Sequence, residues 1–136
     1  MLVLSAVPLA HHGCASPVES PPPPDGGAEL VLDYERYVAD VAPVLERHGC
    51  DAGGDCHGGG IRGSLALSPQ GAKDPAFDFA QVVLQVSPTS IPSSPILTEP
   101  LALDAGGTPH GVKPFATTAD EDYQLVRAWI EAGVTP

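Results

Sequence analysis

Apolar residues recur at helical spacing in a segment near the start of the folded part of the chain, residues 33–48. Asp33 is suited to cap its N-terminus and Gly49 to end it. Pro43 lies inside the segment. Because proline lacks a backbone donor and clashes with the preceding turn, we expect a kink or a split there. The spacing i, i+3, i+4 places these side chains on one face of the predicted helix: Tyr34, Tyr37, Val38, Val41, Val44 and Leu45.

A second helical pattern ends the chain and is the clearer of the two. Thr118 and Glu121 form a T-x-x-E capping box, acidic residues fill the first turn, and Gly133 ends the segment. The simplest prediction for its apolar stripe is burial in a protein core. This stripe consists of Tyr123, Val126, Trp129 and Ile130.

The region between these helices is irregular in composition. Residues 77–86, bounded by Pro75 and Pro88, predict a third helix, with a strand as the alternative because the segment is rich in valine. Residues 87–117 hold six prolines and three glycines and predict one long loop wrapped around something. The pattern as a whole favours an all-α fold with few helices and long connections.

The N-terminal region predicts export. Residues 1–10 are almost wholly apolar but too few to span a bilayer, which needs about 20, and they are similar to the apolar part of a secretion signal. The pair Gly13-Cys14 resembles a bacterial lipoprotein cleavage site, at which Cys14 becomes the lipidated first residue. The alternative is an apolar terminus with an unmodified cysteine. We therefore expect a signal-like segment at 1–13, a proline-rich extended tether at 14–28 and one domain at 29–136.

The net charge of −11, from six Lys and Arg against seventeen Asp and Glu, limits the possible partners. This charge argues against nucleic acids and anionic membrane surfaces as partners, since both are bound through basic side chains. A soluble partner with a basic patch suits this charge, because opposite potentials speed encounter. With only seven aromatic residues the core is thin, and small domains of this kind lean on a disulfide, a metal or a large apolar cofactor.

One short motif carries the candidate chemistry. Cys50 and Cys56 are separated by five residues, His57 follows directly, and three glycines come next. In c-type cytochromes two cysteines bond to the haem, and the adjacent His takes an axial position on iron; the usual gap is two residues. Two alternatives remain open. In an oxidising compartment the cysteines can form a disulfide, and together with His57 and His48 they supply the ligand types of a zinc site, although their crowding is unusual for one.

The order of motifs resembles a known group of proteins. V-A-P-V-L-E-R-H-G-C leads into C-H-G-G-G and G-S-L-A-L-S, followed by T-P-H-G-V-K-P-F and D-E-D-Y-Q-L-V-R-A-W-I-E-A-G. Over residues 34–134 the chain is similar to single-haem cytochrome c domains of exported bacterial proteins, including the planctomycete-type group. This resemblance implies a class I-like cytochrome fold, haem c attached at Cys50 and Cys56, and His57 as the proximal ligand. It also implies a periplasmic or cell-surface location, and electron transfer to a redox partner rather than enzymatic catalysis.

One further site residue is the ligand that would take the sixth coordination position of the haem iron. The only methionine is Met1, inside the signal-like segment, and His48 lies too close to Cys50 to reach the opposite haem face easily. His110 remains, in a Gly-rich loop, and falls where the resembling proteins carry His-Gly; the alternative is an exposed loop histidine. The rival function is a haem-free exported binding module stapled by Cys50 and Cys56. The haem hypothesis requires His57 and His110 to face each other across an apolar slot, and the rival does not. Motifs of hydrolases and phosphate-binding loops are absent from the sequence.

Overall fold

The computed structural model describes residues 30–60 and 63–133; within these ranges the regular elements are helices joined by turns and irregular loops, and an isolated bridge links Leu101 to Phe115. This confirms the all-α prediction for the described residues. The signal-like segment 1–13, Cys14 and the tether 14–28 lie outside them. None of the described helices is both long enough and apolar enough to cross a membrane.

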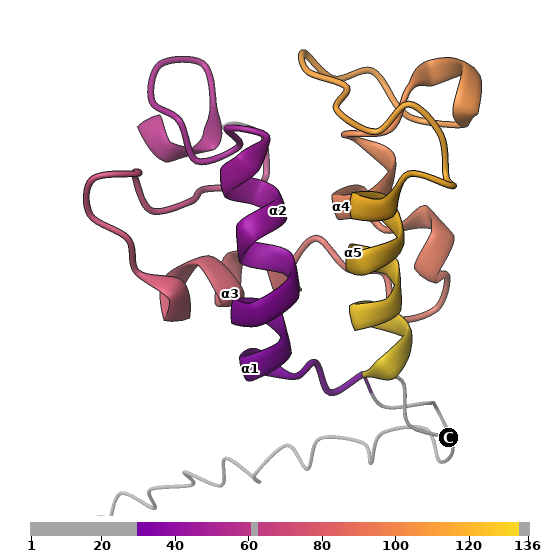
Figure 1. Ribbon diagram of the computed structural model, residues 1–136, viewed down its shortest axis with the longest axis horizontal. Helices are drawn as coiled ribbons and strands as arrows, with labels where there is room; N and C mark the ends of the chain where they lie inside the picture. Colours follow the sequence, from indigo (N-terminus) through magenta and orange to yellow (C-terminus); the bar gives the residue numbers. More distant parts are fainter. Residues whose placement is uncertain (1–29, 61–62, 134–136) are drawn as a thin grey trace, which may run out of the picture.

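The first predicted helix forms as one continuous run of three parts (Figure 1). These are α1 (Tyr34–Arg36), a π-helical turn (Tyr37–Val41) and α2 (Ala42–Arg47). Asp33 caps the run as predicted, its carboxylate accepting the N–H of Arg36 at 2.8 Å. Gly49 ends it with a φ of 68°.

Pro43 changes this helix in a way that the spacing did not predict. The ring of Pro43 crowds the preceding turn, and the chain widens there, so that Ala42 donates its N–H to the carbonyl of Tyr37, five residues back. The helix is thus widened rather than split. Of the six predicted apolar residues, Tyr34 and Val38 are exposed and the other four are buried (Tyr37, Val41, Val44 and Leu45).

The middle of the chain holds more structure than predicted. Residues 75–83 form α3 (Pro75–Val83), so the strand alternative is wrong. The predicted long loop is also partly wrong, because short helical turns interrupt it and turn apolar side chains inward; Leu97, for example, is fully buried. These turns are the 3₁₀ turn Ile91–Ser93, α4 (Pro95–Thr98) and the 3₁₀ turn Leu103–Ala105.

The last helix, α5 (Glu121–Ala132), begins later than the capping-box prediction placed it. Asp120, not Thr118, is its N-cap, because the Asp120 carboxylate accepts the N–H of Asp122 at 3.0 Å. The buried stripe is confirmed at all four positions (Tyr123, Val126, Trp129 and Ile130).

The first run and α5 are held together at both ends. At one end the indole N–H of Trp129 donates to the carbonyl of Asp33 at 2.9 Å, and its ring packs on Tyr37. At the other end Arg47, the last residue of α2, and His48, which caps it, both bond to Asp122 in the first turn of α5. Beyond this second junction lie the loops that follow α2 and precede α5, both at the same end of the molecule (Figure 1).

Candidate functional site

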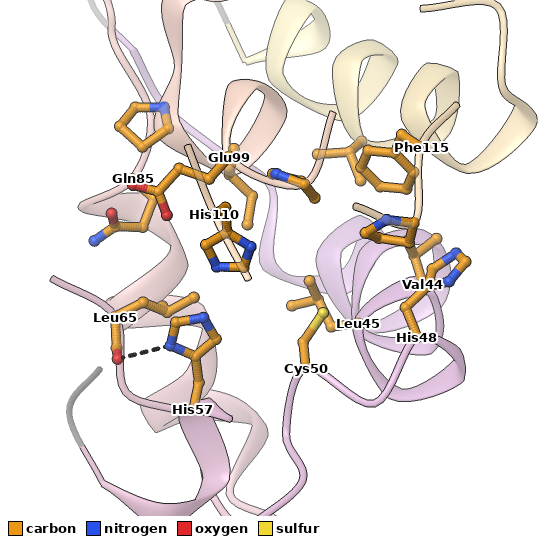
Figure 2. Close-up of a pocket in the computed structure, with 15 residues that line it drawn as sticks. Val44, Leu45, His48, Cys50, His57, Leu65, Gln85, Glu99, His110 and Phe115 are labelled. Carbon is orange, nitrogen blue, oxygen red and sulfur yellow. Dashed lines mark hydrogen bonds between the residues drawn. The ribbon is translucent and has the colours of Figure 1, made fainter. Parts of the chain in front are cut away.

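The end of α2 places Cys50. Gly49 takes the left-handed conformation, its N–H bonds to the carbonyl of Glu46 at 3.0 Å, and the N–H of Cys50 bonds to that of Leu45 at 2.9 Å. This is the Schellman pattern of helix termination, in which the residue after the glycine packs back on the helix. The Cys50 side chain accordingly lies beside Leu45, at the wall of a cavity (Figure 2).

The five residues between the cysteines fold into a closed loop. The N–H of His57 bonds to the carbonyl of Cys50 at 2.9 Å, which joins the two ends of the loop. Gly58 is required there, because a Cβ at this position would lie 1.7 Å from the carbonyl oxygen of Asp51. Both thiols are free in this structure, and neither Cys50 nor Cys56 is fully buried. The wide spacing in sequence therefore still brings Cys50 next to His57 in space.

The ring of His57 is oriented by the segment that follows it. Its Nδ1 lies 3.1 Å from the carbonyl oxygen of Leu65, and its own carbonyl accepts the N–H of Leu67 at 3.0 Å. A carbonyl oxygen only accepts, so Nδ1 carries the proton of the neutral ring and Nε2 is left with its lone pair. Histidine ligands of metals are held by this kind of bond.

His110 is held in the same way from the opposite side. Its Nδ1 lies 2.8 Å from the carbonyl oxygen of Val112, which leaves its Nε2 with a lone pair as well. The loop that carries it is closed by backbone bonds between Pro100 and Phe115, at 3.1 Å, and by the Lys113 ammonium, which bonds to the carbonyls of Glu99 and Thr108.

The two histidine rings face each other. Their centroids are 6.0 Å apart and their planes are within 14° of parallel. Figure 2 shows the two rings next to each other at the cavity. Because an imidazole nitrogen binds a transition metal at about 2 Å, two imidazoles that hold one ion from opposite sides have centroids about 6 Å apart. The pair therefore has the spacing and the tautomers of two ligands to a single metal ion.

A cleft opens at this pair. It has a volume of about 380 Å³, in the range of small-molecule sites, and both cysteines and both histidines line it. A narrower apolar hollow continues it between the helices, sharing Cys50, His57 and His110 with it. The apolar wall of this hollow consists of Val44, Leu45, Leu65, Pro95, Ile96, Phe115 and Val126.

His48 lines the cleft but is already engaged. Its Nε2 lies 2.7 Å from the Asp122 carboxylate, and its ring stands edge-on to Phe115. The hydrogen bond from Arg47, followed by that from His48, outweighs burial and holds the pKa of Asp122 below its ordinary value. Within the described ranges no three His, Cys, Asp or Glu side chains gather into a metal-binding group, so the zinc alternative built on His48 finds no such cluster.

The thiol of Cys50 is set apart by its surroundings. Burial, and after it the neighbouring Asp51 carboxylate, raises the pKa of this thiol to about 11. Cys50 is therefore protonated at neutral pH. It is therefore a poor site for anionic thiolate chemistry.

The structure brings together four of the predicted site residues: Cys50, Cys56, His57 and His110 line one cleft. Cys14 lies outside the described residues. The sequence analysis missed Asp51 and Lys73, whose side chains meet beneath the loop. The one signal was the rarity of lysine, since Lys73 is one of only two in an acidic chain.

Comparison with known proteins identifies no relative. No family model matches the chain, and neither does any curated protein or solved structure. Any statement of function therefore rests on the cleft and on the chain's own residues.

Proposed function

We propose that this chain is an exported c-type cytochrome of class I-like fold that carries electrons through one covalently bound haem. The observation that carries the proposal is the pair of facing imidazoles, His57 and His110, with 6.0 Å between their centroids. Cys50 and Cys56 would hold the porphyrin by thioether bonds, and His57 and His110 would hold the iron. A bound haem supplies a one-electron couple, whose potential depends on axial ligands and burial.

The residues of the cleft fit such a group. A porphyrin is flat and largely apolar, and the hollow beside the histidines is lined by aliphatic and aromatic side chains. The carbonyls of Leu65 and Val112 hold both rings with Nε2 unprotonated, the form that binds metal. Two histidines leave no open position, which favours electron transfer over ligand chemistry and supports a role outside enzymatic catalysis.

The setting of this domain follows from the rest of the chain. The apolar start, Cys14 and the proline-rich tether suit a periplasmic or cell-surface protein with a lipid anchor and a spacer. The acidic charge suits a redox partner with a basic docking patch and argues against a nucleic-acid partner.

The experiment is expression with its own leader in a host that carries cytochrome c maturation genes. We expect a sharp reduced α-band in the absorption spectrum and a haem-stained band that survives a denaturing gel. Cys50→Ala and Cys56→Ala then assign the bonds by the mass of the haem peptides. A colourless protein whose Cys50 and Cys56 resist alkylation until a reductant is added contradicts the proposal and supports the disulfide-stapled binding module.

A further inference from the structure

The loop between the two cysteines contains one buried charged group. Asp51, directly after Cys50, has 1% of its surface exposed, whereas Gly53, Gly54 and Asp55 are exposed. Removing a carboxylate from water costs several kcal/mol unless partners compensate. The buried Asp51 carboxylate therefore ties the glycine-rich loop to the polar groups that compensate its charge.

Asp51 is compensated by the segment that leads into α3. Lys73 Nζ lies 3.3 Å from Asp51 Oδ2, and Gln70 Nε2 lies 3.2 Å from Oδ1. The same ammonium lies 2.9 Å from the buried carboxylate of Asp78, whose side chain also accepts both the N–H and the hydroxyl of Ser68. One lysine thus joins the cysteine loop to α3 through two buried carboxylates.

The surroundings of Lys73 favour the charged form of its side chain. Burial alone lowers the pKa of its ammonium, but the hydrogen bonds that the ammonium donates to Asp78 and Asp51 outweigh that effect and raise the pKa. Its side chain retains 27% exposure, so it bridges the two carboxylates at the edge of the core.

We propose that Asp51 is a positioning residue. It allows two cysteines separated by five residues to reach the porphyrin together, as cysteines separated by two residues usually do. Its anchor to Lys73 holds the Cys50 end of the loop down, so that the four residues up to Asp55 bulge outward and both thiols face the cleft. The inference rests on the proposed function, because it concerns where Cys50 stands when the porphyrin is attached.

Each thioether bond would form by the addition of a cysteine thiol to a vinyl group of the porphyrin. The sulfur of a thiol bonds to one carbon of a vinyl group, and the thiol hydrogen ends on the other carbon. No group leaves, and no oxidant or reductant is consumed. The reaction needs the S–H group beside the vinyl carbon, so a displaced Cys50 fails to react while Cys56, adjacent to His57, still does.

Asp51→Asn tests the inference because it removes the charge at almost constant shape. In the haem-loaded protein we expect the share of molecules with two thioether bonds to fall at least fivefold, with haem kept at Cys56 alone, as measured by peptide mass. Asp40→Asn is the matched control: it makes the same change at a carboxylate that pairs with Arg36, away from the cysteine loop and from Lys73, and we expect the two-bond share to stay unchanged. Equal shares in Asp51→Asn and wild type, or equal losses in both variants, overturn the inference.

A second measurement uses apoprotein made without the maturation genes and kept reduced. We expect Cys50 to react with iodoacetamide at least tenfold faster in Asp51→Asn than in wild type, and Cys56 to react equally in both. Unchanged Cys50 reactivity overturns the inference. Lys73→Gln should reproduce the effect, and it replaces Asp51→Asn should that variant lose its helical circular dichroism. If wild type never carries haem but Asp51→Asn still frees Cys50, the proposed function fails and the anchoring role of Asp51 stands.

Discussion

His110 is the residue on which the axial ligation depends most directly. It is exposed, and its ring is held by the carbonyl of Val112 rather than by packing. In haem-loaded protein we expect His110→Ala to change the spectrum from six-coordinate low-spin to five-coordinate high-spin and to permit carbon monoxide binding, because the sixth position opens.

His48→Ala is the control for this change. His48 also lines the cleft, but its ring nitrogen bonds to Asp122, and we expect its removal to leave the spin state unchanged. A low-spin spectrum retained in His110→Ala together with a high-spin one in His48→Ala would exchange the roles assigned to the two residues.

Gly58 offers a second test at the scale of single residues. A Cβ there would lie 1.7 Å from the Asp51 carbonyl oxygen, so the loop must shift to admit alanine. We expect Gly58→Ala to lower the free energy of unfolding of the apoprotein by about 1–3 kcal/mol, the usual cost of forcing atoms into a packed site.

Gly53→Ala provides the comparison, because a Cβ at that position meets nothing within 4 Å. It should leave the denaturation midpoint of the apoprotein close to that of wild type. Equal midpoints for wild type, Gly58→Ala and Gly53→Ala would contradict the closed loop seen here.

The sequence predicted the cysteine and histidine residues of the cleft but not what holds them. The pattern of Cys56, His57 and the later His110 is visible because the chemistry requires those residue types. The pair between Asp51 and Lys73 spans 22 positions in two irregular segments, and no periodicity connects them. Every residue has a backbone carbonyl, so residue types do not predict that those of Leu65 and Val112 bond to the histidines.

At the scale of the elements, both terminal helices were predicted, but the apolar stripe was predicted correctly for only one of them. The apolar stripe of α5 was confirmed because an uninterrupted α-helix keeps its period. The stripe of the first helix was wrong at Tyr34 and Val38, which are exposed, and the π turn that precedes Pro43 was not predicted. Which local adjustment a proline causes depends on packing that the sequence does not display.

The junction of α2 with α5 makes stability depend on pH. The pKa of Asp122 is held below its ordinary value of 3.8, chiefly by the hydrogen bond from Arg47. A carboxyl with a lower pKa in the folded state stabilises it fully above that ordinary value and loses this contribution as the pH falls through the folded-state pKa. We expect Asp122→Asn to lower the apoprotein melting temperature by about 4 °C at pH 7, a difference that shrinks below pH 3.8.

Glu131→Gln is the control, because it removes an exposed ion pair with Arg127 on the same helix. Exposed pairs contribute little, so its melting temperature should follow that of wild type over the whole pH range. A difference for Asp122→Asn that persists unchanged into acid would show that the loss comes from shape rather than from charge.

At the scale of the whole molecule, the basic residues that the structure describes are engaged in contacts within the chain. Of the six Lys and Arg, Arg62 lies outside the described residues, and each of the other five bonds to an acidic side chain or to backbone carbonyls. These five are Arg36, Arg47, Lys73, Lys113 and Arg127. The surface field is therefore set by the acidic excess that is left over.

This excess predicts how electrons reach the protein. Opposite charge speeds the encounter of two proteins, and salt weakens this attraction because the Debye length falls to about 8 Å at physiological ionic strength. We expect electron transfer between the haem-loaded protein and a small basic redox protein to slow by about tenfold or more between low salt and 0.5 M salt, measured by stopped-flow absorbance.

Two comparisons separate this effect from changes at the haem itself. An uncharged small-molecule reductant should give a rate nearly independent of salt, since no field acts on it. An acidic redox protein of similar size should react slowly at low salt and faster as salt screens the repulsion. If the basic partner also shows a flat salt profile, the −11 charge does not guide docking, and recognition must then depend on short-range contacts around the cleft.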